Sequence, residues 1–547
     1  MHAWTEIPPY GQGGLVVAAL TLVAASVMLL ASPDRDSKTS RNARPLLESL
    51  VSRGSPALLY ALAALALIPV ISELALSTWY LFSPTYIDHI EASTASIAQY
   101  FLRGVPLYPS TNAYTFHALI YGPLLAEANA AGYLLGSGVA ASKLIGWGAA
   151  WLAVATLLFS VPRGGRDWTW VVGGACALCV LTSFGPILTA NRADSLLLLC
   201  ATLALFCVIR LPGLGGWALV GALAGAASAL KLHGLLYVVP AFFIGLCLHG
   251  EPRSWRAAIG AAAAAGAVAA LLPFLPANVT IGGYLTYLKL AAHHGLEWWI
   301  LGTNCAFVAG LWSPVLLIWS IVPSSFSAAT GVRQIPRMWL LALLGAELLV
   351  AVIASKPGAG VHHLLPFLGY HAFLVQRLLK RAEYCSTAAP SVALVCLAAV
   401  LLGTAWPAGA LLRNFLEFDL KLPDQEAAHA ELERWASRYP QGMMGVADRS
   451  SYNLTSLRPW LTLRGVQQTD YGALMDWKLS GVSDAPLVNA LEQCAIPELF
   501  VPKGGEPFSM TNGYGGPLFS DAVLETFARH YSLVSTGRFF VVFACHA

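Results

Sequence analysis

Apolar stretches alternate with short polar connections along about the first three quarters of the chain. The apolar runs recur between Gly14 and Leu412, and each is close to the roughly 20 residues that a helix needs to cross the hydrocarbon of a bilayer. After Leu412 the sequence is ordinary and polar. The pattern therefore predicts a membrane body over residues 1–412 and a tail outside the membrane over residues 413–547.

We predict about twelve membrane-spanning helices in the body, one for each apolar run. They cover residues 14–32, 56–78, 141–161, 169–189, 194–210, 216–230, 233–249, 257–275, 298–322, 338–355, 362–376 and 390–412. The first run follows no basic segment and precedes no clear small-residue cleavage site, so it is read as a retained span rather than a signal peptide. The predicted fold is a polytopic α-helical membrane protein.

The tail shows the shorter periodicities of a small folded domain. Strands are predicted at 442–447, 499–502 and 538–543, and helices at 423–439 and 520–531. The two cysteines of the tail, Cys494 and Cys545, either form one disulfide, as a pair in an exported domain does, or remain free thiols. We therefore predict a C-terminal soluble α/β domain, which binds an acceptor or shields the active site.

The composition agrees with a membrane environment for most of the chain. Hydrophobic residues make up 57% and charged residues 11%, with a mean hydropathy of +0.63, whereas soluble domains have roughly 25% charged residues. The formal net charge is only +3, and nothing in the charge distribution indicates a nucleic-acid partner. Cys176 and Cys179 form a Cys-x-x-Cys pair, but they lie in an apolar run and are read as small apolar side chains.

Lysine and arginine alternate between rich and poor connections. The rich connections hold 15 bases and lie at 33–55, 162–168, 210–215, 250–256, 323–337 and 377–389. The poor connections and their borders hold six bases, namely Arg103, Lys143, Arg192, Lys231, Lys289 and Lys356. The positive-inside rule places the poor connections, the N-terminus and the tail outside the cytoplasm. We predict a multi-pass protein of the cytoplasmic (inner) membrane with a long outward loop over 79–140.

One segment of this outward loop, residues 114–135, is apolar enough to suggest a thirteenth span. It also carries His117, Glu127 and Asn129. Counting it as a span would move every later connection to the opposite side of the membrane. We therefore interpret it as an amphipathic helix that lies along the outer interface.

Three outward connections keep isolated bases next to the membrane, each with polar neighbours. They contain Arg192 with Asp194, Lys231 with His233, and Lys356 with His362 and His363. Charges at such depths are costly, and a functional site is the default hypothesis for them. The alternative is that the Lys and Arg stems extend along the interface and carry their charges into water.

The outward loop opens with an acidic segment at 86–91. Asp88 and Glu91 are three residues apart, which places them on one face of a helix, and His89 follows Asp88 directly. A carboxylate beside the membrane can accept a proton from a hydroxyl nucleophile or hold a metal ion. The alternative is a helix-capping Asp88 and a solvated Glu91.

The elements that follow the acidic segment come in a characteristic order. We predict a helix with an apolar face at 95–102, a turn at 103–109 that includes Tyr108, and a return to the membrane at 121–124. This order resembles the first external loop of the GT-C glycosyltransferases, membrane enzymes that take a sugar from a polyprenyl-phosphate carrier outside the cytoplasmic membrane. The resemblance covers most of the membrane body. In that superfamily the catalytic aspartate lies near the start of this loop, which is the place of Asp88 here.

Two further elements are similar to the protein mannosyltransferase and aminoarabinose transferase branches of the superfamily. One is Arg192 followed by Asp194 at the start of a Leu-rich span, and the other is Lys-Leu-His-Gly at 231–234. The chain departs from the family in replacing an adjacent Asp-Glu pair by Asp88 and Glu91, and in carrying an extra N-terminal span. The branch, and with it the sugar, stays open.

The resemblance implies a polyprenyl-phosphate-sugar donor and a glycan, lipid or protein acceptor. Asp88 would act as the general base, and Glu91 or His89 would tune its pKa or orient the acceptor. The residues implied for binding the donor phosphate are Arg192, Lys231, Lys356, His233, His362 and His363. Asp194 would orient a base or a sugar hydroxyl, and Tyr108 would support the loop.

A metal ion is not required by this interpretation. A divalent cation could bind Asp88 together with His89, His293 and His294, since carboxylate and imidazole groups are common metal ligands. No ligand spacing in the sequence favours such a site. We therefore predict no metal ligands and leave a divalent cation as an open alternative.

The chief alternative function is a transporter or flippase for a lipid-linked anionic substrate, because outward-facing bases in a helical bundle also suit the movement of an anion. Against it, no internal repeat relates two halves of the chain, and Glu347 is the only clearly central acid. A second alternative is a catalytically silent scaffold that binds cell-wall glycans with its tail.

Overall fold

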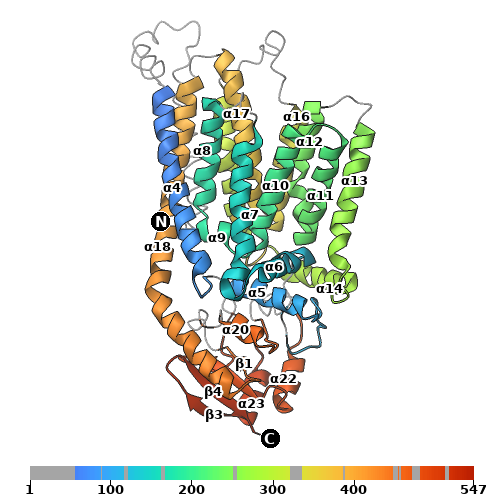
Figure 1. Cartoon of the computed structure of the whole chain (residues 1–547), viewed down its shortest axis with the longest axis vertical. Helices are drawn as coiled ribbons and strands as arrows, with labels where there is room; N and C mark the ends of the chain where they lie inside the picture. Colours follow the sequence, from blue (N-terminus) through green and yellow to red (C-terminus); the bar gives the residue numbers. More distant parts are fainter. Residues whose placement is uncertain are drawn as a thin grey trace.

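The computed structural model describes residues 56–87, 89–115, 117, 121–161, 167–249, 255–320, 336–385, 389–446, 454, 457–470, 481–511 and 516–546. The predicted first span at 14–32 and the predicted catalytic residue Asp88 lie outside these ranges. Within them the chain forms a helical bundle and, beyond one end of the bundle, a small sheet with short helices (Figure 1). We call the end of the bundle that faces this sheet the sheet end.

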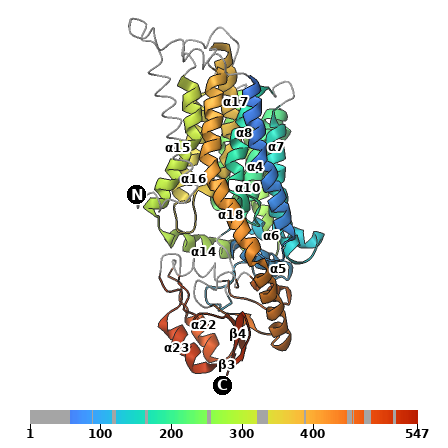
Figure 2. The same ribbon diagram turned by 90° about the vertical axis from the view of Figure 1, so that its left-hand side faces the viewer.

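Long helices run beside one another between the two ends of the bundle (Figures 1 and 2). They are α4 (Pro56–Phe82), α7 (Gly138–Ser160), α8 (Trp168–Thr182), α10 (Ala193–Arg210), α11 (Leu214–Leu230), α12 (Val239–His249), α13 (Trp255–Leu271), α15 (Trp298–Ser320), α16 (Arg337–Ile353), α17 (Leu368–Cys385) and α18 (Ala389–Arg438). Short helical segments extend four of them, namely α9 (Gly185–Thr189), η3 (Leu232–Tyr237), η4 (Leu272–Phe274) and η7 (Val361–Phe367). Each predicted span from 56–78 onward coincides with one of these helices or with a helix and its extension.

Six helices in the described part of the chain are long and apolar enough to cross a membrane. They are Leu58–Phe82, Gly138–Ser160, Ala193–Arg210, Leu232–His249, Trp255–Phe274 and Trp298–Ser320. Trp168–Thr182, Leu214–Leu230 and Ala389–Ala405 are shorter apolar helices. The number of helices that cross the membrane, about twelve in the sequence analysis, stays a prediction.

Short helices lie across the sheet end of the bundle (Figure 1): α5 (His89–Leu102), α6 (Pro123–Leu135) and α14 (Ile281–Ala291). The predicted helix at 95–102 is the second half of α5. The predicted interfacial helix at 114–135 is shorter than expected, because α6 begins only at Pro123. Proline fixes a backbone angle suited to the first helical turn, and the preceding Gly122 is extended.

One continuous helix joins the bundle to the sheet. α18 has 50 residues, which corresponds to about 75 Å at about 1.5 Å per residue, and Figure 2 shows it passing from the bundle to the sheet. The prediction of two separate elements, a span at 390–412 and a tail helix at 423–439, was wrong. The change from apolar to polar residues at 413 changes the surroundings of the helix and leaves its backbone helical.

The sheet has the strand order β1-β2-β4-β3. Its strands are β1 (Met443–Met444), β2 (Glu498–Pro502), β3 (Tyr531–Thr536) and β4 (Phe540–Cys545). β1 pairs with β2 in parallel, and β4 pairs antiparallel with both β2 and β3. β1, β2 and β4 match the predicted strands, and α23 (Asp521–His530) matches the predicted helix at 520–531. The sequence analysis missed β3, which follows α23 without a turn signal.

The sheet is fixed to α18 and closed by a disulfide. The buried carboxylate of Glu431 in α18 accepts backbone N–H groups of Arg538 and Phe540, each at 2.9 Å, and so holds the turn between β3 and β4. Cys494 and Cys545 form a disulfide, which confirms the first of the two alternatives left open by the sequence. The tail is therefore held as one unit by both a helix and a covalent link.

The tail also contacts the first external loop. The hydroxyl of Tyr100 in α5 accepts the N–H of Gln468 at 2.7 Å. The guanidinium of Arg103, one of the six outward bases, donates to two carbonyls at the end of α20 (Arg458–Leu463), including that of Leu463 at 2.8 Å. Arg103 thus has a structural role in seating the tail against α5.

Candidate active site

Three connections that are far apart in the sequence meet at the sheet end of the bundle. Lys231 lies between α11 and η3, and its ammonium group is 2.8 Å from Oδ1 of Asp194 at the start of α10. The same ammonium lies 3.2 Å from Nδ1 of His363 in η7. Each of these three side chains is less than a tenth exposed. The structure therefore brings one acid and two bases, predicted from separate connections, into direct contact.

The other predicted phosphate ligands surround this contact. Arg192 lies 3.6 Å from Asp194, and the ring of His363 lies 4.5 Å from that of His362 and 6.0 Å from that of His233. We call the whole set the basic cluster, and it consists of Arg192, Asp194, Lys231, His233, Lys356, His362 and His363. Its three permanent bases face one carboxylate, so with neutral imidazoles it carries a net positive charge.

The electrostatics of the cluster agree with this excess of positive charge. Burial lowers the pKa of the Lys231 ammonium from its usual range. The Asp194 carboxylate raises that pKa, while the positive charges of Arg192 and Lys356 lower it further. An anion placed among these groups would oppose the repulsion between the three bases.

Polar groups in and beside the cluster are buried without hydrogen-bond partners among the described residues. They include the side-chain amide of Asn191, which is fully buried, and Nε2 of His233. Buried polar groups normally have a partner in the protein, in ordered water or in a ligand. Asn191 stood in the sequence beside Arg192 but was assigned no role there. Its place beside Arg192 in the same outward connection was the signal that could have singled it out.

Two glycines allow the backbone to approach closely around Lys231. Gly122 donates its N–H to the carbonyl of Leu230 at 2.9 Å, and a Cβ at Gly122 would lie 1.9 Å from the carbonyl oxygen of Ala229. A Cβ at Gly234 would lie 1.8 Å from the carbonyl oxygen of Ala227. Real Cβ atoms do not come this close to oxygen, so both positions require glycine if the loop is to keep this shape.

Tyr121, next to Gly122, places its aromatic ring beside Lys231. The Lys231 ammonium lies 5.2 Å from the centre of the Tyr121 ring, within the range of a cation–π interaction. The carbonyl of Tyr121 accepts the hydroxyl of Tyr108 at 2.9 Å, and Tyr108 is itself buried against Tyr284 and Tyr287. Tyr108, predicted as a supporting residue, therefore acts on the cluster through Tyr121.

The acidic segment approaches the same place through Glu91. Asp88 lies outside the described residues, and His89 is the first residue of α5. The carboxylate of Glu91 is buried and accepts the hydroxyl of Tyr80 at 2.5 Å and the backbone N–H of Asn191 at 3.1 Å. Glu91 thus ties the start of α5 to the residue that precedes Arg192.

The remaining outward bases lie apart from this arrangement. The Lys143 ammonium is buried and donates to the carbonyls of Tyr80, Ser83 and Thr85, at 2.9, 3.0 and 2.6 Å. It therefore satisfies carbonyls at and just beyond the end of α4, which a helix leaves without partners of its own. Lys289 in α14 is exposed.

The described residues also contain a set of side chains placed to hold a metal ion. Ligand atoms of Asp194, His362 and His363 lie within 4.8 Å of one another. The Lys231 ammonium contacts both Asp194 and His363, so two of these three side chains already have a base as a partner in this structure. The alternative set proposed around Asp88 involves a residue outside the described ranges and stays a prediction.

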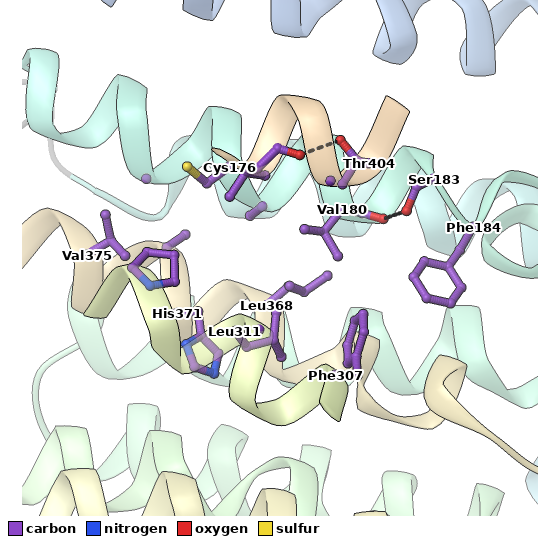
Figure 3. Close-up of a pocket in the computed structure, with 17 residues that line it drawn as sticks. Cys176, Val180, Ser183, Phe184, Phe307, Leu311, Leu368, His371, Val375 and Thr404 are labelled. Carbon is purple, nitrogen blue, oxygen red and sulfur yellow. Dashed lines mark hydrogen bonds between the residues drawn. The ribbon is translucent and has the colours of Figure 1, made fainter. Parts of the chain in front are cut away.

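Another buried acid lies in the middle of the bundle. Glu347 in α16 accepts the indole N–H of Trp312 at 2.5 Å and contacts Nε2 of His371 at 2.5 Å. His371 also lines a pocket of about 60 Å³ among α8, α15, α17 and α18, shown in Figure 3. The residues lining this pocket include no Lys, Arg, Asp or Glu, so it offers no charged path for an anion beside Glu347.

The fold is similar to that of two solved structures of ArnT from Cupriavidus metallidurans, which agrees with the resemblance drawn from the order of the first external loop. The apo structure of ArnT aligns with a TM-score of 0.52, and the structure bound to undecaprenyl phosphate with a TM-score of 0.54. Each alignment covers 88% of this chain and 98% of the ArnT chain at 12% sequence identity.

This likeness is one of structure, and comparison of the sequence alone finds no similar curated protein. No protein-family model matches the chain, and no curated protein matches it. At 12% identity the similarity to ArnT shows the fold. Together with the apolar helices, it indicates a multi-pass membrane protein with an ArnT-like fold.

Proposed function

We propose that the protein is a glycosyltransferase that moves a sugar from a polyprenyl-phosphate donor to an acceptor at the outer face of the cytoplasmic membrane. The observation that carries this proposal is the basic cluster, with its excess of positive charge and the buried, unpartnered amide of Asn191 beside it. The fold supports it, since ArnT of the same fold has been solved with bound undecaprenyl phosphate.

The phosphate of the donor lies among the bases in this proposal. Lys231, Arg192 and Lys356 provide charge-assisted contacts, which are the strong kind for phosphate oxygens. Asn191 and His233 supply further polar contacts at buried positions. Asp194 holds the Lys231 ammonium in place, so it positions a ligand of the phosphate without touching the phosphate itself.

The reaction is a displacement at the anomeric carbon of the donor sugar. The acceptor hydroxyl oxygen forms a bond to this carbon while the bond from the carbon to the phosphate oxygen breaks. The hydroxyl proton passes to Asp88 as the general base. The polyprenyl phosphate leaves with the bonding electron pair, and the basic cluster stabilises its growing negative charge.

Glu91 serves to position the base rather than to accept a proton. Its carboxylate is buried and already accepts hydrogen bonds from Tyr80 and from the backbone of Asn191. It joins the start of α5, which directly follows Asp88 in the sequence, to Asn191 beside the basic cluster. His89 orients the acceptor from the first turn of the same helix.

The test is sugar transfer from a radiolabelled polyprenyl-phosphate sugar by purified protein carrying Asp88→Asn. We expect transfer to fall by about 100-fold or more, since general-base catalysis contributes about 10²–10⁴-fold. Glu127→Gln in α6 is the matched control, because burial raises the pKa of Glu127 to about 7 and the proposal gives this carboxyl no role. Full transfer by Asp88→Asn would overturn the assignment of the base.

A further inference from the structure

A second, larger cleft opens between the membrane body and the tail. It has a volume of about 830 Å³, within the range of ligand-binding sites in proteins. One wall is the first external loop at Thr111, Asn112 and Tyr114, a second is the end of α14 at Leu290, and the third is α22 (Ala485–Glu492) with its flanks. The cleft is thus built from three parts of the chain that lie far apart in the sequence.

The described residues that line this cleft are a mixture of polar and apolar side chains. They include the amides of Asn112, Asn489 and Gln493 and the hydroxyls of Thr111 and Ser483, and none of the described lining residues is a Lys, Arg, Asp, Glu or His. Such amides and hydroxyls both donate and accept hydrogen bonds. An anionic ligand would require bases, and a purely apolar ligand would leave these groups without partners. The lining therefore fits a neutral ligand that is rich in hydroxyl groups.

The arrangement of the lining groups also suits a sugar chain. Asn489 and Gln493 are four residues apart at the end of α22 and so lie on the same side of the helix. Both are exposed, while Tyr114 across the cleft is half-buried and packs against the core of the tail. Its ring offers a flat apolar surface with a polar tip, of the kind that an amphipathic ligand covers.

The walls are held in place by contacts outside the cleft. The hydroxyl of Thr469 in the tail donates to the carbonyl of Tyr114 at 2.9 Å. The disulfide between Cys494 and Cys545 fixes the residues that follow α22 to β4. A site with fixed walls loses less entropy when it binds a ligand.

The cleft and the basic cluster are joined by one segment of chain. The segment that lines the cleft at Tyr114 continues to Tyr121, whose ring lies over Lys231. The part of the loop before Tyr114 is held at Pro109, because the carbonyl of Pro109 accepts the hydroxyl of Tyr287 in α14 at 3.0 Å. A ligand in the cleft therefore touches the same loop that forms a wall of the proposed donor site.

We propose that this cleft binds a neutral oligosaccharide, and that this oligosaccharide is the part of the acceptor that lies outside the membrane. The second half of this inference rests on the proposed function, whereas the binding of a neutral sugar chain stands on the lining alone. The sequence left three classes of acceptor open, namely glycan, lipid or protein. The proposed cleft selects an acceptor that carries a glycan.

The experiment measures binding of neutral hexasaccharides of glucose, mannose, galactose and N-acetylglucosamine to the purified full-length protein by saturation-transfer NMR. We expect at least one series to bind, and the double substitution Asn489→Ala with Gln493→Ala to weaken its binding by about tenfold, the effect of losing two hydrogen bonds. Glu492→Ala on the same helix, outside the cleft lining, is the matched control and should leave binding unchanged. Binding of undecaprenyl phosphate is measured on the same samples.

The outcomes separate the two proposals. Sugar binding that falls in the double variant, with undecaprenyl phosphate binding intact, supports the inference. Absence of binding by every series, or equal binding by the wild type and the double variant, overturns it without affecting the donor site. Sugar binding in a protein that does not bind undecaprenyl phosphate keeps the carbohydrate site and overturns its role as the acceptor site.

Discussion

The basic cluster and the Glu347 site are both built around a buried acid, but the charges and hydrogen-bond partners around the acid differ. Asp194 contacts Lys231, and Glu347 contacts His371, in each case from a different helix. Both oxygens of Glu347 have partners, since Trp312 donates to the second one. Around Asp194, by contrast, positive charge exceeds negative charge.

The difference lies in what each site leaves unsatisfied. Each oxygen of the Glu347 carboxylate has a partner, as expected for a group that stabilises helix packing inside a membrane, and Nδ1 of His371 is the atom at this site without a partner among the described residues. The basic cluster contains Nε2 of His233 and lies beside the amide of Asn191, and these buried groups also have no partner among the described residues. A site that is incomplete without a ligand is suited to bind one. We therefore infer that Glu347 stabilises the bundle and that the basic cluster around Asp194 binds a ligand.

The largest effect is expected from Lys231→Ala. Removing one partner of a buried charge pair costs about 2–5 kcal/mol or more, so we expect the affinity for undecaprenyl phosphate to fall by about 100-fold. Because Asp194 is then left buried without its nearest base, the melting temperature falls as well. Isothermal titration and thermal unfolding in detergent measure the two effects. Lys289→Ala, which removes an exposed base of α14, should change neither.

The double variant Lys231→Ala with Asp194→Ala separates binding from folding. It removes both charges, so the melting temperature should recover while the affinity for undecaprenyl phosphate stays low. Recovery of affinity together with stability would show that Lys231 acts only as a structural partner of Asp194, and the contrast with the Glu347 site would disappear.

The next effect is expected from Gly234→Ala. The added Cβ would lie 1.8 Å from the Ala227 carbonyl oxygen, so the loop that carries Lys231 has to shift. Such overpacking costs about 1–3 kcal/mol of stability, and the displaced Lys231 should weaken undecaprenyl phosphate binding by about tenfold. Gly302→Ala, where a Cβ meets nothing within 4 Å, is the control. Equal behaviour of the two variants in thermal unfolding and titration would contradict the close approach.

A smaller effect is expected from Glu347→Gln, and it should fall on stability rather than on binding. The substitution removes the charge that His371 and Trp312 contact, and a hydrogen bond between membrane helices is worth about 0.6 kcal/mol on average and up to about 1.7. The melting temperature should fall by a few degrees, while the affinity for undecaprenyl phosphate stays within about twofold of the wild type. A tenfold loss of affinity would place Glu347 in the ligand site and revive the transporter hypothesis.

The smallest effect is expected from Asn191→Ala, and it tests the contrast between the basic cluster and the Glu347 site most closely. In Asn191→Ala an amide with no partner in the described structure is removed, so stability should remain unchanged or rise, whereas the affinity for undecaprenyl phosphate should fall by about three- to tenfold. Asn129→Ala is the matched control, since its buried amide donates to the carbonyl of Leu125 at 2.8 Å. That variant should lose stability and keep its affinity. The reverse pattern in unfolding and titration would contradict the role given to Asn191.

The sequence predicted the bundle well because long apolar runs mark helices in a membrane protein. It failed at α18, since a change in composition at 413 carries no information about whether the backbone stays helical. It also missed β3, whose exposed residues such as Leu533 and Val534 lack the alternation of a half-buried strand. Composition thus predicts the surroundings of an element better than its ends.

The members of the basic cluster were chosen correctly as neighbours because single bases stand out in base-poor connections. Their mutual contacts could not be predicted, since Asp194, Lys231 and His363 are brought together by helix packing and not by spacing in the sequence. The same limit explains Lys143, an outward base that donates to carbonyls at and just beyond the end of α4. Only the fold shows which groups each base contacts.

The most direct test of the central claim is a structure of the purified protein with bound undecaprenyl phosphate, determined by electron cryomicroscopy. The account predicts the phosphate at the sheet end of the bundle, with oxygens within about 3 Å of the Lys231 ammonium and of the Asn191 amide, which is hydrogen-bond distance. A phosphate that lies elsewhere, for instance beside His371 in the middle of the bundle, would contradict it.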